Sequence, residues 1–370
     1  MKSLLLPLWL LACRRQGFLG NLFYFILLPL SWAYGPALRL SMDRRRSLPR
    51  FMEKVPVILV GNITVGGTGK TPLAAGLASR LAESGWKPAV ISRGYGGRRR
   101  SDPARVSGEG AVLMGPGEAG DEPVMLARHL GPGADVFVGR DRVAAALMAV
   151  SSGAGSVVLD DGFQQRGRFP GAFRVLVVNA ADAFGNGALL PAGSLREPVE
   201  AISEAGAVIL THADEVSADQ LARVRAACAV PGAGAVIALA SWRFQGLDPA
   251  VGSLPNASLK GCKVLALSAI GYPAGFELML ERETGCPVVA MRRPDHHAWS
   301  APELAAAARA APVLGCGLVA TTTKDFMKME GLLPANPEVP MAVVRAGLVL
   351  VEGEAELDKA LAGYLAGFRG

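Results

Sequence analysis

Residues 57–72 read VILVGNITVGGTGKTP, and this stretch decides the fold of the N-terminal half. An apolar, β-branched run leads into a glycine-rich segment that ends in Gly-Lys-Thr, and Ala/Leu-rich sequence follows. The pattern predicts a strand, a loop and a helix N-terminus, the arrangement that cradles phosphate groups. We therefore predict a P-loop whose nucleotide-binding residues are Thr64, Gly66, Gly67, Thr68, Gly69, Lys70 and Thr71.

The residue types in this loop match the chemistry of nucleotide binding. Small residues let backbone N–H groups surround an anion, Lys70 can reach the β- and γ-phosphates, and the Thr71 hydroxyl can ligate Mg²⁺. The usual pattern has glycine where this chain has Thr64, so Gly66 and Gly67 must supply the flexibility. A glycine-rich turn without a ligand is the alternative, and the spacing of Lys and Thr argues against it.

Composition limits the possible partners. The chain has 370 residues, of which 51% are hydrophobic and 19% charged, with a net charge of +6. Its pI is about 9.2 and its mean hydropathy is +0.31, which is high for a purely soluble enzyme. These values favour an anionic partner such as a nucleotide, nucleic acid or acidic lipid. The five cysteines are scattered without CxxC spacing, which indicates neither a disulfide framework nor a zinc site.

The N-terminal segment carries no charge from Gly17 to Leu38, and 22 residues are enough to cross a bilayer. Prolines and glycines interrupt it, and arginines flank it on both sides, at 14–15 and at 44–46. We predict an interfacial helical segment whose basic flanks lie on anionic headgroups. A true span and a soluble hydrophobic helix remain alternatives. An export signal ending at Cys13 is disfavoured, because it would separate the P-loop from cytoplasmic nucleotide.

Two further strands carry polar residues at their ends. Residues 87–92 predict a second strand, and the Gly/Arg-rich loop after it should open on the ligand edge of the sheet. In that loop Arg93 and Tyr95 are candidate contacts to a polar or sugar substrate, whereas the run 98–100 suits a solvated face. Residues 156–159 predict a strand ending in Asp160-Asp161, as expected of a carboxylate placed near Mg²⁺. An Asp-Gly turn is the alternative.

The alternation of strands and helices predicts an α/β fold: a P-loop NTPase-like, doubly wound parallel sheet with a second, smaller α/β domain. In the second half the pattern predicts strands at 263–269, 287–291 and 317–322, and helices at 273–284 and 301–311. The stretch 231–255 is rich in Gly, Ala and Pro and favours a connection. The predicted organisation is a membrane-associating segment at 1–45, a P-loop domain at 46–230, a connecting segment at 231–256 and a smaller C-terminal α/β domain at 257–370.

Taken together, the motifs resemble one family, the tetraacyldisaccharide 4'-kinases of lipid A biosynthesis. The resemblance is carried in order by GNITVGGTGKTP at 61–72, SRGYGG at 92–97, GDEP at 120–123, DDGFQ at 160–164, PAGSLREP at 191–198, THADE at 211–215, PDHH at 294–297 and TTTKD at 321–325. It implies ATP and Mg²⁺ as cosubstrates, with transfer of the γ-phosphoryl group to the 4'-hydroxyl of an acylated glucosamine disaccharide 1-phosphate. The family acts at the cytoplasmic face of the bacterial inner membrane.

The resemblance also implies roles for single residues. Asp121 corresponds to the general base, assisted by His296, although the pattern alone favours Asp121 as a helix cap. Asp160 or Asp161 would hold the metal, with Glu197 as a possible helper. Contacts to the lipid or to the transferring phosphate are expected from Arg93, Tyr95, Arg142 and Arg196.

Three positions depart from the common family pattern: Ser194, Tyr272 and Thr323. None belongs to the proposed transfer machinery, but Tyr272 and Thr323 bear on the nucleotide side of the second half. The main alternative function is a membrane-associated P-loop switch ATPase without a lipid acceptor. Nucleic-acid binding is disfavoured because the cationic runs lack interleaved aromatic residues. The motifs indicate no oligomeric state.

Overall fold

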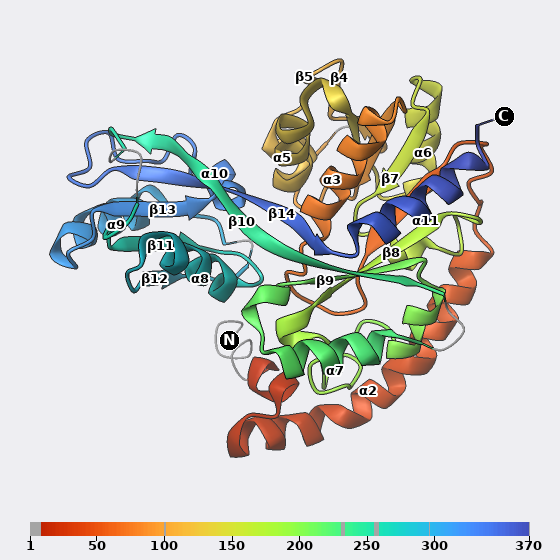
Figure 1. Ribbon diagram of the computed structural model, residues 1–370, viewed down its shortest axis with the longest axis horizontal. Coiled ribbons are helices and arrows are strands. Elements are labelled where there is room, and N and C mark those ends of the chain that lie inside the picture. Colours follow the sequence, from red (N-terminus) through yellow and green to blue (C-terminus); the bar gives the residue numbers. More distant parts are fainter. Residues whose placement is uncertain (1–8, 100, 231–233, 255–258, 296, 370) are drawn as a thin grey trace.

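The computed structural model describes residues 9–99, 101–230, 234–254, 259–295 and 297–369. Its centre is one twisted sheet of 12 strands in the order β12-β11-β13-β14-β10-β9-β8-β1-β7-β2-β6-β3, which runs through both halves of the molecule (Figure 1). The strands are β1 (Val57–Gly61), β2 (Pro88–Ser92), β3 (Ala104–Arg105), β6 (Asp135–Val138), β7 (Ser156–Leu159), β8 (Phe173–Asn179), β9 (Ala207–Thr211), β10 (Val236–Val251), β11 (Val264–Ser268), β12 (Val289–Arg292), β13 (Leu318–Thr322) and β14 (Met341–Glu352), and a hairpin joins β4 (Ser107–Gly108) to β5 (Ala111–Val112).

Helices cover this sheet and connect its parallel strands. The α-helices are α2 (Gly17–Arg46), α3 (Lys70–Glu83), α4 (Pro116–Ala119), α5 (Asp121–Leu130), α6 (Arg142–Ser151), α7 (Ala218–Cys228), α8 (Pro273–Thr284), α9 (Ala301–Val313), α10 (Thr323–Met329) and α11 (Glu354–Ala366). Short 3-10 helices are η1 (Gly131–Gly133), η2 (Phe163–Gln165), η3 (Ala180–Asp182), η4 (Val199–Glu204) and η5 (Ala213–Glu215).

The predicted P-loop strand lies in the middle of the N-terminal half. All five residues of β1 are buried, and it pairs in parallel with β7 on one side and β8 on the other. Helix α3 turns its apolar stripe, including Leu73, Leu77 and Leu81, onto the core of this half. Because the strands run in parallel, the residues that follow β1, β2 and β7 meet at one edge of the sheet. The predicted α/β class is confirmed.

A long antiparallel ribbon joins the two halves. Its composition predicts an irregular connection at 231–256, but most of that segment is β10, which pairs in parallel with β9 over Val236–Leu239 and then with β14. Strand β14 in turn pairs in parallel with β13. The sheet therefore continues from one half into the other, and backbone hydrogen bonds rather than a loose linker set their spacing.

The C-terminal half has the predicted alternation of elements. Strands β11, β12 and β13 pair in parallel, and α8 begins and ends at the predicted residues. The predicted boundary at 257–370 needs a correction at its end. Helix α11 packs on the P-loop half, where Leu357, Leu361 and Leu365 join the same core as α3. An apolar stripe at i, i+4 and i+8 needs a partner, and the core of the P-loop half, which includes α3 and β10, provides it.

Helix α2 lies along the outside of the P-loop half (Figure 1). It is continuous for 30 residues, and both Pro29 and Pro36 lie within it. The expectation that these prolines interrupt the helix is therefore wrong. By length and composition it could cross a membrane, and only 11% of its most apolar window is buried, unlike the core helix of a soluble domain. Its inner face is held to the domain, since Ser31 Oγ donates to the Leu189 carbonyl at 2.8 Å.

Candidate active site

The P-loop adopts the conformation that its glycines allow. Gly66 and Gly69 have φ of 120° and 83°, which only glycine adopts without strain. Thr64, at the position where glycine is usual, is buried and forms a backbone bridge with Leu195. This segment is therefore extended and anchored to the loop at 191–198, which explains why it needs no glycine there.

Two P-loop side chains meet the carboxylates that follow β7. The Thr71 hydroxyl donates to Asp160 Oδ2 at 3.0 Å, and Lys70 Nζ lies 4.0 Å from Asp161 Oδ1. Strands β1 and β7 are direct neighbours in the sheet. The P-loop follows the end of β1 and the two aspartates follow the end of β7, so these residues lie side by side. The structure thus brings together Lys70, Thr71, Asp160 and Asp161, four of the residues that the sequence assigns to phosphate and metal binding.

The two aspartates differ in their electrostatics. Burial, and then the negative charges of Glu122 and Asp161, raise the pKa of Asp160 to about 7. Burial also acts to raise the pKa of Asp161, but Lys70 and Arg196 outweigh it and hold that pKa below its ordinary value. Asp160 Oδ1 is buried and has no hydrogen-bond partner in the part of the chain that the structure describes. An orphaned buried carboxylate oxygen beside a Thr hydroxyl fits a cation site.

The described residues contain no group of three or more His, Cys, Asp or Glu side chains that could hold a metal ion alone. This does not conflict with Mg²⁺, which binds through one or two carboxylates while substrate phosphates and waters complete its shell. The donor set of Asp160 and Thr71 beside a phosphate-binding loop fits that pattern.

Arginines surround the carboxylates. Arg196 donates to both oxygens of Asp161, at 3.2 and 3.4 Å, and to Asn62 Oδ1 at 3.2 Å. Arg142 is buried at the start of α6, and burial lowers its pKa to about 10 even though Asp160 and Asp161 act to raise it. Arg93, at the end of β2, is exposed but close enough for its charge to act on Arg142. The predicted arginines therefore converge on one place.

Arg99 is a site residue that the sequence pattern missed. The arginine run at 98–100 suits a solvated face, yet the Arg99 side chain is only 5% exposed. Its guanidinium donates to the carbonyls of Gly94 and Arg93 and to Asp102. Arg99 thus holds the loop that carries Arg93 and Tyr95, whose own ring is 72% exposed.

Helix α5 starts beside the P-loop site. Asp121 is its first residue, and Asp121 Oδ2 lies 3.6 Å from Lys328 Nζ of α10. Glu122 pairs with Lys324 at 3.0 Å, and Lys324 also bonds Asp295 at 3.2 Å. The two carboxylates act to raise the pKa of Lys324, and this outweighs the lowering effect of its burial. One lysine therefore links the GDEP, PDHH and TTTKD motifs.

The predicted partner of Asp121, His296, lies outside the described residues. Its neighbours are held firmly: Asp295 bonds Lys324, and the His297 ring contacts the Glu303 carboxylate at 3.1 Å. Through Lys324, Asp295 therefore lies near Glu122 at the start of α5.

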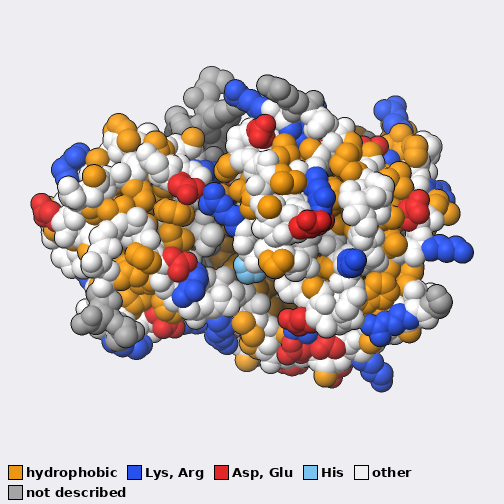
Figure 2. Space-filling view, turned by 90° about the horizontal axis from the view of Figure 1, so that it is seen from above, with side chains coloured by type: hydrophobic (Ala, Val, Ile, Leu, Met, Phe, Trp, Pro, Cys, Tyr) orange, Lys and Arg blue, Asp and Glu red, His pale blue; other side chains and the backbone are white. Residues whose placement is uncertain are grey.

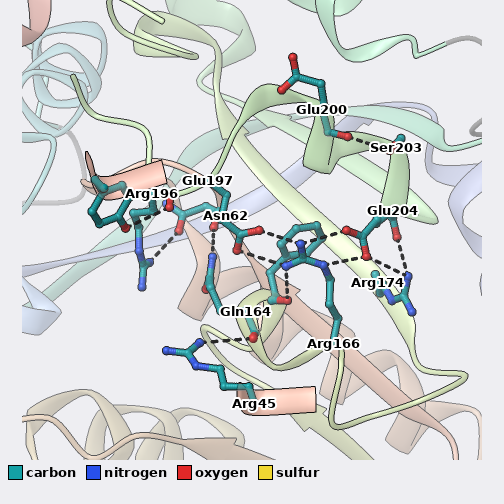
Figure 3. A network of polar contacts seen from close by, with 12 residues as sticks. Arg45, Asn62, Gln164, Arg166, Arg174, Arg196, Glu197, Glu200, Ser203 and Glu204 are labelled. Atoms are coloured by element: carbon teal, nitrogen blue, oxygen red, sulfur yellow. Dashed lines mark hydrogen bonds and ion pairs between the residues drawn. The ribbon is translucent and has the colours of Figure 1, made fainter. Parts of the chain in front are cut away.

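Glu197, the predicted metal helper, has a different partner. Its carboxylate is buried against Arg166, with an ion pair of 2.8 Å. Figure 3 shows Glu197 and Glu204 on either side of the Arg166 guanidinium. This pairing stabilises the loop that carries Arg196, and a metal-binding role for Glu197 stays a prediction.

Tyr272, one of the departures from the family pattern, joins the two halves. Its ring packs edge-on against His212, with centroids 4.5 Å apart, and its hydroxyl bonds Glu215. Burial and the Glu215 charge raise the pKa of this phenol to about 12. Seen from above, the surface is hollowed between the two halves, with Lys and Arg side chains at the hollow (Figure 2). Tyr272 therefore packs the C-terminal half against the segment that follows β9.

Comparison with known proteins agrees with this geometry. The family model described as Tetraacyldisaccharide-1-P 4'-kinase matches residues 23–366. A tetraacyldisaccharide 4'-kinase of Anaeromyxobacter dehalogenans (strain 2CP-1) is 42% identical over 335 residues, which cover 88% of this chain and 87% of the relative. One from Alkalilimnicola ehrlichii is 38% identical and covers 83% and 84%. A crystal structure described as an "apo" form of LpxK from Aquifex aeolicus in complex with ATP matches with a TM-score of 0.68 and 29% identity, covering 93% of this chain and 99% of that one.

Proposed function

This chain belongs to the tetraacyldisaccharide-1-P 4'-kinase family, and from that premise we propose how its own residues carry out the reaction. The enzyme transfers the γ-phosphoryl group of ATP to the 4'-hydroxyl of tetraacyldisaccharide 1-phosphate, which gives the bis-phosphorylated lipid A precursor. The observation that carries the residue assignment is the meeting of Lys70 and Thr71 with Asp160 and Asp161 at the edge of the sheet.

ATP and Mg²⁺ occupy the junction of β1 and β7 in this proposal. Backbone N–H groups from Gly66 to Thr71 surround the phosphates, and Lys70 binds the β- and γ-phosphates. Asp160 and Thr71 hold the cation, as the unpartnered oxygen of Asp160 supports. When bound there, Mg²⁺ would supply positive charge that offsets the negative charge developing on the transferring phosphoryl group. Asp161 keeps Lys70 and Arg196 in place.

Arginines receive the transferring group and the anionic lipid. Arg142 is buried, so its charge acts in a region of low dielectric and stabilises the equatorial oxygens of the transferring phosphoryl group. Arg93 and Tyr95 are exposed at the rim and contact the sugar headgroup. Because a loose phosphoryl-transfer transition state needs little covalent chemistry, these charges contribute more than the base does.

Asp121 accepts the proton of the 4'-hydroxyl. It stands at the N-terminus of α5, half-exposed, next to Glu122, whose charge reaches Asp160. The attacking hydroxyl would thus lie between Asp121 and the γ-phosphate. His296 orients the Asp121 carboxylate and relays its proton. Asp295, the residue before His296, bonds the same lysine as Glu122, which supports this role.

Helix α2 places the enzyme on the cytoplasmic surface of the inner membrane. Phe18, Phe25 and Trp32, spaced by seven residues, are exposed by 81%, 58% and 69%. The opposite face bonds the domain through Ser31 and Tyr34. A transmembrane orientation would break these bonds, whereas an interfacial one keeps them and lowers the apolar face into the headgroup region. This arrangement favours the predicted interfacial position over a transmembrane span.

Phosphate transfer from γ-labelled ATP to purified tetraacyl disaccharide 1-phosphate in mixed micelles tests the proposal. We expect labelled bis-phosphorylated lipid with wild-type protein and none with Lys70→Ala. Asp121→Asn should bind ATP normally but lose at least about 100-fold in transfer rate. Release of free phosphate without lipid, and no labelled lipid, would instead support a switch ATPase.

A further inference from the structure

A cationic pocket lies where the C-terminal end of α2 meets the loop after β7. It has a volume of about 140 Å³ and is lined by five arginines and one acid, Glu204. The arginines come from three separate segments: Arg45 and Arg46 from α2, Arg166 and Arg168 from the loop, and Arg174 from β8. This site is outside the P-loop and takes no part in the mechanism above.

Two of the five arginines are already neutralised. Arg166 bonds Glu204 through Nε and one terminal nitrogen, at 2.8 and 3.0 Å, and its other side pairs with Glu197. Arg168 forms two bonds to Asp141, at 3.0 and 3.2 Å, and both arginine side chains are buried. Arg166 and Arg168 therefore form the rigid floor of the pocket. The unbalanced positive charge of the pocket comes from the other three arginines.

The remaining three arginines have spare donors. Arg45 makes one long bond, 3.4 Å, to the Gln164 carbonyl, and it meets no carboxylate within the described ranges (Figure 3). Among the described residues, Arg46 pairs with Asp43 at 3.5 Å, and Arg174 contacts Glu204 through the backbone carbonyl at 3.3 Å and through the carboxylate at 3.8 Å. Arg46 and Arg174 are close enough to Glu204 that, with Arg166, they hold its pKa below the ordinary value despite its burial. Three incompletely paired guanidinium groups thus converge on one small space.

Position relative to the membrane identifies the ligand. The exposed apolar face of α2 enters the boundary between headgroups and acyl chains, so lipid phosphates lie above the acyl chains, level with the body of the helix. Arg45 belongs to the basic run at the C-terminal end of α2 and projects from the side that carries Ser31 and Tyr34 and faces the domain. The pocket is therefore on the headgroup side of the helix and not on the side of the acyl chains. We propose that this pocket binds the phosphate of an anionic phospholipid headgroup and so fixes the orientation of the enzyme on the membrane.

The chemistry and the size of the pocket agree with this ligand. Guanidinium groups bind phosphate through paired, charge-assisted hydrogen bonds, which a diffuse basic surface does not offer. The volume accommodates a phosphate group but not a disaccharide. Gln164, at the pocket wall, also donates to the Asn62 carbonyl, and Asn62 accepts from Arg196. The pocket is therefore joined to the active site through neighbouring residues while remaining separate from it.

Vesicle flotation of the full-length protein tests the proposal without ATP or acceptor lipid, so its result is independent of the kinase assignment. Vesicles contain phosphatidylcholine alone or with one fifth phosphatidylglycerol. The pocket variant is Arg45→Gln/Arg46→Gln, and its matched control is Arg44→Gln/Arg50→Gln, two exposed arginines that do not line the pocket but remove the same charge. We expect the pocket variant to lose roughly tenfold more affinity for the anionic vesicles than the control.

A second variant approaches the pocket from the domain side. Arg174→Gln should show the same selective loss, and its melting temperature verifies that it folds. Equal losses in the pocket and control pairs would show a diffuse charge effect and overturn the proposal. Inorganic phosphate at millimolar concentration separates the two sources of this anion. Phosphate could raise the melting temperature of the wild-type protein but not that of Arg174→Gln, while both proteins bind vesicles equally. That result would show that the site binds free phosphate, and the lipid assignment would fail.

Discussion

Gly67 in the P-loop and Gly271 in the C-terminal half are packed backbone against backbone. A Cβ on Gly271 would lie 2.5 Å from the Gly67 amide nitrogen and 2.9 Å from its Cα. A Cβ on Gly67 would in turn meet the Tyr272 amide nitrogen at 3.2 Å. Since backbone cannot yield as a flexible side chain can, the two halves are fitted to each other at the phosphate-binding loop.

Gly271→Ala should therefore impair ATP use. The added methyl group displaces the P-loop at a cost of about 1–3 kcal/mol, so we expect kcat/KM for ATP to fall about 5- to 150-fold. Gly363→Ala is the matched control, because nothing lies within 4 Å of its Cβ position in α11. That control should keep full activity and gain up to about 1 kcal/mol of stability. Equal activity of both variants would show that the contact does not constrain the loop.

Asp160 gives the cation-free enzyme a distinctive pH dependence. Its pKa is raised from 3.8 to about 7, so between these values the folded state holds a proton that the unfolded state has lost. The free energy of unfolding should therefore fall as the pH rises from 4 to 7. Asp160→Asn should remove this slope and raise stability at pH 7 by roughly 1–3 kcal/mol, as measured by urea denaturation in EDTA. An unchanged slope would mean that Asp160 ionises normally.

The sequence predicts the phosphate-binding half of the site well, because its signals are local. A strand, a glycine loop and a Lys-Thr pair lie within residues 57–72, and the acids after β7 follow a second apolar run. Adjacent parallel strands then force Thr71 and Asp160 together, and the structure places their side chains 3.0 Å apart.

Long-range pairing is what the sequence could not supply. The ribbon of β10 and β14 joins residues about a hundred positions apart, and the Gly- and Ala-rich composition before it favours a loop. The Arg99 side chain is buried because it bonds carbonyl groups that come together only in the folded loop, so the sequence pattern could not predict its burial. The partner of Glu197 could not be predicted for the same reason. Arg166 is 31 residues away and outside the PAGSLREP motif that contains Glu197.

Arg99 should act as a positioning residue for the lipid headgroup. Arg99→Gln removes donors to the carbonyls of Gly94 and Arg93, and hydrogen bonds from a charged donor contribute about 1.5–3 kcal/mol. We expect KM for the lipid to rise about tenfold or more while ATP binding is unchanged. Arg98→Gln, an exposed neighbour, should behave like wild type. A parallel loss of ATP affinity would instead indicate general unfolding of the loop.

Helix α2 should influence the active site through Tyr34. The Tyr34 hydroxyl donates to the Arg196 carbonyl at 3.1 Å, so the helix touches the backbone of a residue that contacts Asp161. Tyr34→Phe loses one hydrogen bond of about 0.5–1.5 kcal/mol, and we expect kcat/KM for the lipid to fall about two- to tenfold. Tyr24→Phe, on the same helix with its ring beside Phe25, is the control. Steady-state kinetics in mixed micelles measure both.

The exposed face of α2 should carry most of the membrane affinity. Replacing Phe18, Phe25 and Trp32 with serine removes large apolar side chains that are exposed on one face and leaves Ser31 and Tyr34 in place. Each such side chain contributes about 1.5–3 kcal/mol when buried, so we expect vesicle affinity to fall at least about 100-fold, with unchanged ATP binding. Val313→Ser/Leu314→Ser, exposed apolar residues at the end of α9, should float normally. Alkaline carbonate should extract the wild-type protein, because an interfacial helix does not cross the bilayer; resistance to carbonate would instead establish α2 as a span.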